Sequence, residues 1–297
     1  MVAGVIDTLR QKYRSGDMLV KFLFINIGVF VVLRIAALVL YIAGLPAEWP
    51  LQWLGMPASG SELLTRPWTV LTYMFVHYDI LHILFNMLWL YWLGRIFIEV
   101  FTPKHFVALY IYGGIAGALL YAVASNLSPV MSSNGLLIGA SASVMAIVVA
   151  SAMRSPDYQV GLLFFGNISL KWIALVSILI DMLSIDMGNI GGNIAHLGGI
   201  GMGALFAWLY GRGIDIAKPF NRIIDKIVSH SWQRQSAKTP NARFADNRAQ
   251  RTSAAKNASK SEAEVEMDTI LEKIKHSGYA SLTPEEKNRL FDVTKKV

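Results

Sequence analysis

Two polar residues lie within apolar stretches of this chain, in positions where they could carry out hydrolytic chemistry. Ser141 opens a run of small and apolar residues that continues to Ala150. His196 lies in a second, glycine-rich run that ends near Gly211. A serine hydroxyl becomes an effective nucleophile when a neighbouring base takes its proton, and histidine is the most common base for this purpose. We therefore treat Ser141 and His196 as a candidate nucleophile and its general base.

Helix packing offers a simpler explanation for the serine taken alone. Ala142, Ala146 and Ala150 follow one another at intervals of four residues, and a face of small residues lets membrane helices approach closely. The histidine favours the catalytic interpretation, because an ionisable side chain within a membrane segment marks a functional site by default. The small residues that flank Ser141 and His196 would let their helices come within hydrogen-bonding distance.

A second pair of polar residues, His82 and Asn86, is spaced four residues apart and so shares one helical face. Asp79 precedes the pair as a candidate N-cap, which predicts a helix that begins there and holds His82 in its first turn. Two interpretations stay open. The pair could form interhelical hydrogen bonds, worth about 0.6 kcal/mol each in membrane proteins. Alternatively, both side chains could donate hydrogen bonds to a reaction centre.

The elements that must position these residues are membrane helices. Of the 297 residues 54% are hydrophobic and 16% are charged, and the mean hydropathy is +0.44, which is typical of a polytopic membrane protein. We predict an all-α protein with a bundle of six transmembrane helices over residues 22–212. Six apolar stretches support this count: 22–45, 68–93, 105–125, 135–153, 170–187 and a last stretch that ends near 212.

The segments outside the bundle are polar and mostly basic. Residues 1–21 do not resemble a removable signal peptide and are expected to form a cytoplasmic N-terminal segment. Residues 213–260 are expected to form a basic linker, with an amphipathic helix over 220–228 at the inner membrane surface and a disordered remainder. Residues 261–297 predict a small module of two short helices, the second opened by a capping box from Thr283 to Glu286. No motif identifies a partner for this tail.

The distribution of basic residues predicts the orientation of the bundle. The connections on one side of the predicted membrane hold one Lys or Arg in total. The segments on the other side, which include both termini, hold twenty-five, so the positive-inside rule places both termini in the cytoplasm. Ser141, His196 and His82 would then lie in the outer half of the membrane. The net charge of +7 comes largely from the tail and is explained by attraction to anionic lipid rather than by nucleic acid binding.

Two further charges, Arg34 and Asp181, fall within predicted spans. Arg34 could pair with Asp181, or it could face the protein or extend toward the interface, and we favour the second interpretation. No carboxylate is expected to orient His196, so the residues favour a dyad over a triad. Other protease mechanisms fit poorly, because there is no His-Glu-x-x-His zinc motif and Asp181 and Asp186 belong to the same short helix rather than to two facing ones.

In their order and spacing these residues resemble the rhomboid family of intramembrane serine proteases. The resemblance covers residues 66–211 and rests on three motifs: His82-xxx-Asn86, Gly139-x-Ser141 and Ala195-His196-xx-Gly199-xxx-Gly203. It implies that Ser141 is the nucleophile and His196 the base. It also implies that His82, Asn86 and the backbone N–H of Ser141 stabilise the oxyanion, with Gly139 among the oxyanion and substrate-binding residues.

The resemblance further implies what such a protein acts on and where. Its substrates would be single-span membrane proteins cut near the extracytoplasmic face, with no cofactor or metal, in the inner membrane of a bacterium. Two alternatives stay open: a catalytically weak or inactive relative that binds membrane clients, and a small transporter that uses polar notches in its helices.

The chain departs from common rhomboid patterns at three positions. Ala142 follows the nucleophile, where glycine is frequent, and Met145 stands where many relatives have an aromatic residue that packs on the histidine. Thr69 follows Trp68, where some bacterial relatives have arginine. The first two departures leave the dyad intact, with packing and backbone expected to orient His196, and the third predicts a differently anchored first loop.

Overall fold

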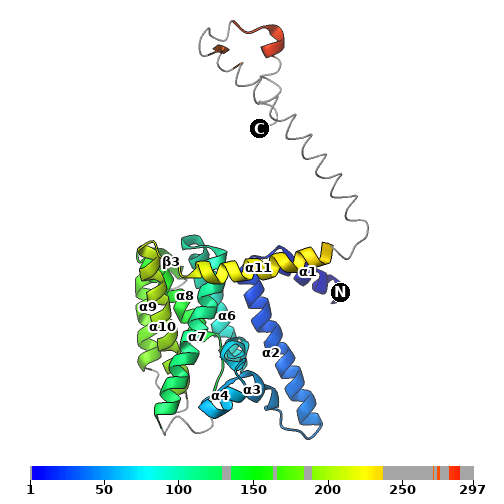
Figure 1. Ribbon diagram of the computed structural model, residues 1–297, viewed down its shortest axis with the longest axis vertical. Coiled ribbons are helices and arrows are strands. Elements are labelled where there is room, and N and C mark those ends of the chain that lie inside the picture. The colour runs from blue at the N-terminus through cyan, green and yellow to red at the C-terminus, as the bar shows by residue number, and fades with distance from the viewer. Residues whose placement is uncertain are drawn as a thin grey trace. The chain divides into compact units, whose positions relative to one another are not determined.

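The computed structural model describes residues 2–128, 135–162, 166–183, 189–236, 270, 273–274 and 281–287. It divides into two compact units, Met1–Ile224 and Asp225–Val297. The first unit is a bundle of helices that contains every candidate site residue (Figure 1).

The bundle is built from helices joined by short connections. They are α1 (Val2–Ser15), α2 (Met18–Ile42), α6 (Ile80–Val100), α7 (Pro103–Leu127), α8 (Ser141–Arg154), α9 (Leu170–Leu183) and α10 (Ile190–Gly211), followed by α11 (Ala217–Ser236). Within the described residues, α2, α6, α7 and α10 are long and apolar enough to cross a membrane. The other two predicted spans, α8 and α9, have 14 residues each and reach only about 21 Å, short of a hydrocarbon core of about 30 Å.

Polar caps fix where the long helices begin. Asp79 caps α6, where its Oδ1 accepts a hydrogen bond from the backbone N–H of His82 at 2.7 Å, so the predicted N-cap is confirmed. Thr102 caps α7 in the same way, and Pro103 occupies the first helical position, where a missing N–H costs nothing. The cap at Asp79 fixes the start of α6 and so places His82 in its first turn.

The long connection between α2 and α6 has structure of its own. It contains the helices α3 (Trp49–Leu54), α4 (Gly60–Thr65) and α5 (Thr69–Thr72), then a 3-10 turn over Tyr73–Phe75. Trp53 and Trp68 stack with ring centroids 6.1 Å apart, and the indole N–H of Trp68 donates to the carbonyl of Trp53 at 2.9 Å. This tryptophan pair anchors the loop, and the guanidinium of Arg66 adds hydrogen bonds to the carbonyl of Gln52 and to Glu62.

Two short antiparallel strand pairs were not predicted. Strand β1 (Met56–Pro57), in the long connection, pairs with β2 (Leu136–Leu137) just before α8. Strands β3 (Gln159–Leu162) and β4 (Gly166–Ser169) form a hairpin between α8 and α9. The first pair is important for the site, because it joins the segment just before Ser141 to the long connection between α2 and α6.

The centre of the bundle is a close contact of α7, α8 and α10 made by small residues. A Cβ added to Gly117 of α7 would lie 2.7 Å from Cβ of Ala142 and 2.8 Å from the carbonyl oxygen of Ala195, too close for any real side chain. A Cβ added to Gly199 or Gly203 of α10 would lie closer still to the backbone of α8 and would overlap a carbonyl oxygen in each case. The predicted small-residue faces are therefore the surfaces on which these three helices meet.

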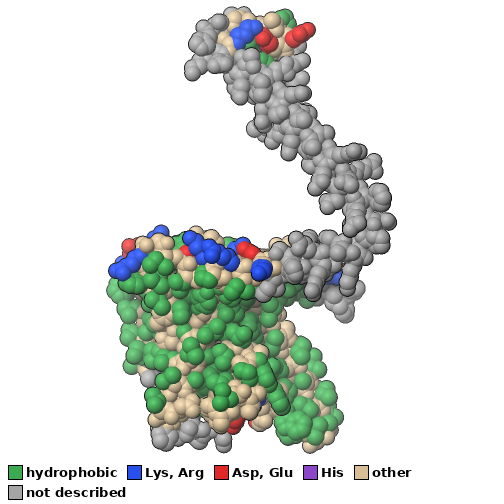
Figure 2. Space-filling view, viewed as in Figure 1, with side chains coloured by type: hydrophobic (Ala, Val, Ile, Leu, Met, Phe, Trp, Pro, Cys, Tyr) green, Lys and Arg blue, Asp and Glu red, His purple; other side chains and the backbone are tan. Residues whose placement is uncertain are grey.

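Charged groups of the bundle are segregated from its apolar flanks. Lys and Arg side chains gather at the end where α11 begins, and hydrophobic side chains cover the sides (Figure 2). Arg34 of α2 stacks its guanidinium 5.9 Å from the ring centroids of Phe30 and Tyr78. The alternative in which Arg34 pairs with Asp181 is wrong, because Asp181 has other partners, as described below.

In the second unit the described residues are few. The capping box predicted at Thr283 is confirmed: the N–H of Thr283 donates to Glu286 Oε2 at 2.7 Å, and the N–H of Glu286 donates to Thr283 Oγ1 at 3.3 Å. Of the linker predicted over 213–260, α11 covers the amphipathic helix expected at 220–228 and extends to Ser236, into the part expected to be disordered. Its remainder, 237–260, lies outside the described residues, as do most of the first helix of the tail module and Asp186.

Candidate functional site

Ser141 and His196 lie within hydrogen-bonding distance of each other. Ser141 is the first residue of α8 and His196 lies in the second turn of α10. Oγ of Ser141 and Nε2 of His196 are 2.6 Å apart, and both side chains are partly buried. This is the separation that proton transfer from a serine hydroxyl to a histidine base requires.

The backbone before Ser141 explains why α8 begins there rather than near Gly135, where the sequence predicted its start. Leu136 and Leu137 are held in β2, and the N–H of Gly139 donates to the carbonyl of Tyr73 at 3.0 Å. Gly139 has a φ of +116°, and a Cβ there would lie 2.7 Å from Nε2 of His82, so only glycine fits. The helix therefore starts inside the bundle, with no side-chain cap on its first N–H groups, and its positive dipole end lies at the site.

The structure brings His82 and Asn86 to the same place from α6. Asn86 is buried, and its Nδ2 donates to the carbonyl of His82 at 2.9 Å, which leaves the second amide hydrogen free to donate elsewhere. The ring of His82 packs against Gly139 and lies edge-on to the ring of His77, with centroids 5.1 Å apart. Residues of three helices, α6, α8 and α10, thus lie together at Ser141.

One residue of the site was assigned no place in it from sequence: Asp181, in the last turn of α9. Its Oδ1 forms a short hydrogen bond with Nδ1 of His196, the ring nitrogen that faces away from Ser141. The expectation that no carboxylate is positioned to orient His196 is therefore wrong. A carboxylate in an apolar span requires a polar partner, and the helix that holds Asp181 is the one before the histidine helix, so this requirement was the available signal.

Asn193 completes the polar cluster from the first turn of α10. Its Nδ2 donates to the carbonyl oxygen of Asp181 at 2.8 Å and to the carboxylate Oδ1 of Asp181 at 3.3 Å. Within the described part of the chain, Oδ1 of Asn193 and Nδ1 of His77 are buried and have no protein partner. Buried polar atoms of this kind are usually satisfied by water.

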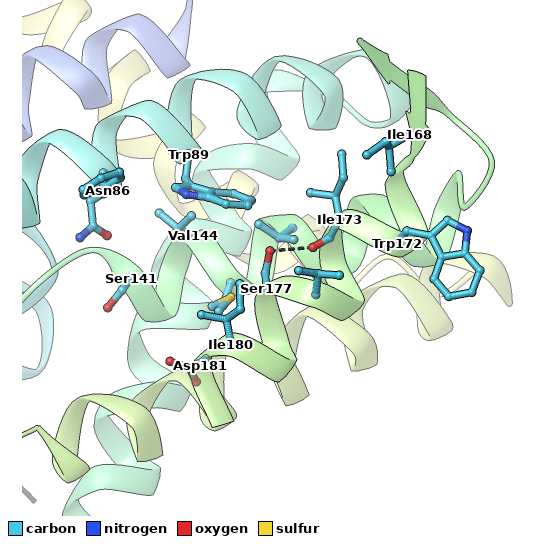
Figure 3. Close-up of a pocket in the computed structure, with 14 residues that line it drawn as sticks. Asn86, Trp89, Ser141, Val144, Ile168, Trp172, Ile173, Ser177, Ile180 and Asp181 are labelled. Carbon is cyan, nitrogen blue, oxygen red and sulfur yellow. Dashed lines mark hydrogen bonds between the residues drawn. The ribbon is translucent and has the colours of Figure 1, made fainter. Parts of the chain in front are cut away.

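A pocket of about 650 Å³ opens next to Ser141, between α6, α8 and α9. Asn86, Ser141 and Asp181 lie toward one end of it, and Ile168 and Trp172 toward the other (Figure 3). The wall between them is apolar and is formed by Phe85, Trp89, Val144, Met145, Val148, Ile173, Val176 and Ile180, with Ser177 the remaining polar residue. Ser177 Oγ donates to the carbonyl of Ile173 within its own helix. In the described residues, no three His, Asp or Glu side chains cluster as metal ligands would.

Comparison with known proteins identifies the family. Residues 64–213, half of the chain, match the sequence model of the Rhomboid domain. The chain belongs to the rhomboid family. Together with the four long apolar helices, this makes it an integral membrane protein. A second match, over residues 255–296, is to a family described as a "Family of unknown function (DUF6576)".

Several individual proteins are similar to this rhomboid. It is 31% identical over 153 residues to RHOMBOID-like protein 12, mitochondrial, of Arabidopsis thaliana, covering 47% of this chain and 45% of that protein. It is 27% identical over 207 residues to Rhomboid protease GlpG of Pectobacterium atrosepticum, covering 68% and 65%. It is 28% identical over 148 residues to Presenilin-associated rhomboid-like protein A, mitochondrial, of Danio rerio, covering 48% of this chain and 36% of that protein. This rhomboid therefore matches less than two thirds of the length of each of these relatives.

Proposed function

We propose that this rhomboid is a serine endopeptidase that cuts single-span membrane proteins within or beside their transmembrane segment. The observation that carries the proposal is the 2.6 Å separation between Oγ of Ser141 and Nε2 of His196. The place of Ser141 at the polar end of an otherwise apolar pocket supports it, because a transmembrane segment could lie in such a pocket.

In the proposed reaction, Oγ of Ser141 attacks the carbonyl carbon of the scissile peptide while its proton passes to Nε2 of His196. The C–N bond then breaks, the proton moves from His196 to the leaving amine, and the acyl group stays on Ser141 as an ester. A water molecule attacks the ester with His196 again as base, which frees Ser141 and the second product. The buried polar atoms of His77 and Asn193 give that water a polar approach.

The negative charge that develops on the carbonyl oxygen needs hydrogen-bond donors already in place. The start of α8 offers the backbone N–H of Ser141 with the positive end of the helix dipole, and Asn86 offers its second amide hydrogen. The ring of His82 lies beside Gly139, two residues before Ser141. Removing one such donor costs about 10²–10³ in rate in soluble proteases.

The proposed topology has six spans, with α8 and α9 as the two short ones. The basic end of the bundle would face the cytoplasm with both termini, in a bacterial inner membrane, and the site would lie toward the outer face. The short length of α8 agrees with this arrangement, because non-helical backbone at membrane depth is tolerated where protein surrounds it. The segment before Ser141 is surrounded by α6, α7 and the loop.

The test is cleavage of a single-span model substrate by the purified full chain in liposomes. Wild type should produce two fragments whose junction, mapped by mass spectrometry, lies near the extracytoplasmic boundary of the substrate. Ser141→Ala and His196→Ala should each abolish cleavage without altering thermal unfolding.

Ser143→Ala is the matched control for the serine substitution. Ser143 lies two residues further along α8, is fully buried and has no hydrogen-bond partner for its hydroxyl among the described residues, so its loss should leave cleavage intact. Cleavage that survives Ser141→Ala would refute the proposal. Wild-type protein that binds the substrate without cutting it would favour the alternative of a client-binding rhomboid.

A further inference from the structure

A carboxylate that contacts the base of a serine protease from behind can control the state of that base. In this rhomboid, Oδ1 of Asp181 and Oγ of Ser141 contact opposite nitrogens of the His196 ring. A carboxylate accepts hydrogen bonds and does not donate them, so contact with Asp181 places the ring proton on Nδ1 and leaves Nε2 free to accept the proton of Ser141. It also stabilises the positive charge that the ring gains during the reaction.

The carboxylate is itself held in a fixed position. Asn193 donates to both the carbonyl and the carboxylate of Asp181, and it lies one turn before His196 on the same helix. The side chains of His196 and Asp181 are only 14% and 10% exposed, so little water competes for their contact. Low exposure makes the electrostatic interaction stronger than at a surface.

Among the described residues, Asp181 supplies hydrogen bonds from the second half of α9 to α10. The buried residues of α9, Leu170 and Ala174, lie in its first half. Beyond them Leu179, Ile180 and Leu183 are exposed, with Ile180 lining the pocket. With its buried residues confined to the first half, the second half of α9 depends more heavily on the polar contacts of Asp181 with α10.

We propose that Asp181 is a positioning residue for His196, and that it makes the orientation of this base depend on the seating of α9 against α10. The inference rests on the proposed function, because it assigns Asp181 a role in the reaction of Ser141. When α9 is seated, Asp181 fixes the ring of His196 toward Ser141. When α9 moves away from α10, the ring loses its partner and Ser141 loses its activated base.

The test compares Asp181→Ala, Asp181→Asn and Asp181→Glu in the full chain, with kcat and KM measured on the single-span substrate. In soluble serine proteases, replacing the aspartate behind the base by asparagine lowers kcat about 10⁴-fold with the geometry intact. We expect Asp181→Ala and Asp181→Asn each to lower kcat at least about 10²-fold with KM within about threefold of wild type. Asp181→Glu, which restores a carboxylate, should recover about tenfold or more over Asp181→Ala.

The asparagine variant separates positioning from simple fastening of α9. Asparagine keeps the volume of Asp181 and an oxygen that can accept from Asn193, so a purely structural role predicts near-normal kcat. Asp181→Asn within about twofold of wild type would overturn the positioning role.

A second buried His–Asp pair supplies the matched control. Nε2 of His105 in α7 lies 3.1 Å from Oδ2 of Asp215, and the two side chains are 9% and 15% exposed, much like His196 and Asp181. Asp215→Asn should leave kcat within about twofold of wild type. An equal loss of kcat in Asp215→Asn and Asp181→Asn would show that any broken His–Asp pair impairs the bundle, and would overturn the inference.

The coupling to α9 has its own measurement. The chain has no cysteine, so Leu179→Cys and Leu205→Cys introduce a single pair of spin-label sites on exposed positions of α9 and α10. Pulsed electron paramagnetic resonance should show a broader distance distribution when Asp181→Ala is added, and no broadening when Asp215→Asn is added. An unchanged distribution with Asp181→Ala would overturn the coupling.

Failure of this inference and failure of the proposed function give different results. Cleavage that is lost in Ser141→Ala but normal in Asp181→Asn overturns the positioning role and leaves the protease proposal standing. Cleavage that survives Ser141→Ala overturns both, because the role of Asp181 depends on that of Ser141.

Discussion

Gly199 is the position at which one methyl group should separate the proposed nucleophile from its base. It lies one turn after His196 on α10 and faces Ala142, the neighbour of Ser141 on α8. A Cβ at Gly199 would overlap the carbonyl oxygen of Ala142 and would lie 2.8 Å from its carbonyl carbon. Both groups belong to helical backbone and cannot rotate aside, so Gly199→Ala must push the two helices apart.

The size of the separation can be worked from these contacts. Carbon atoms in van der Waals contact lie about 3.5–4.0 Å apart, so a carbon 2.8 Å away requires a retreat of about 1 Å. The same retreat would take Oγ of Ser141 and Nε2 of His196 from 2.6 Å to about 3.6 Å, beyond the range of about 2.6–3.2 Å for proton transfer. A misplacement of about 1 Å can cost about 10²-fold in rate. The free energy of unfolding should fall only modestly, since overpacking costs about 1–3 kcal/mol and alanine regains about 1 kcal/mol of helix propensity over glycine.

The assay is steady-state cleavage of a single-span fluorogenic substrate, with thermal unfolding followed by tryptophan fluorescence. Gly201→Ala is the matched control, because it lies on the same helix with nothing within 4 Å of its added Cβ. Gly199→Ala should lower kcat about 10²-fold, whereas Gly201→Ala should keep wild-type kcat and unfold at an equal or higher temperature. Normal kcat in a folded Gly199→Ala protein would refute the argument that close packing of α8 and α10 sets the distance between Ser141 and His196.

Three other predictions follow from the proposed site. His82→Ala and Asn86→Ala should each lower kcat about 10²–10³-fold without abolishing turnover, and unchanged kinetics in both would make this face of α6 purely structural. Truncation after Arg234 should leave cleavage in detergent near normal, because every candidate site residue lies before Arg212; loss of cleavage by a folded truncated protein would assign the tail a role in catalysis. Substrates should be cut after a small residue and near a helix-weakening one, since glycine loosens a helix by about 1 kcal/mol relative to alanine and the scissile carbonyl must leave its helix. Efficient cutting of a rigid poly-leucine span would contradict that unwinding step.

Local patterns predicted much of the fold. The N-cap at Asp79 and the small-residue faces are properties of single helices, so spacing alone reveals them. The start of α8 could not be predicted this way. The apolar pattern continues back to Gly135, but pairing of Leu136 with a strand from the first loop and the φ of Gly139 hold this segment out of the helix. Those contacts join segments far apart in the sequence.

Asp181 shows the same limit of periodicity in the site itself. From sequence, Arg34 was the one partner considered for Asp181, and no carboxylate was expected behind His196. The packing of α9 on α10, which periodicity within one helix does not reveal, decides the partner. Arg34 instead stacks on aromatic rings, and the carboxylate contacts His196. The departure at Met145, which lacks the aromatic ring expected beside the histidine, is consistent with this arrangement, since Asp181 supplies the contact that orients the ring.

Covalent labelling of Ser141 tests the central claim most directly. A fluorophosphonate reacts with a serine hydroxyl only when a base activates it. Mass spectrometry of the labelled full chain should place a single adduct on the peptide that contains Ser141, and His196→Ala should remove it while Ser143→Ala retains it. An adduct on a different serine, or cleavage-competent protein whose Ser141 stays unlabelled, would contradict the account.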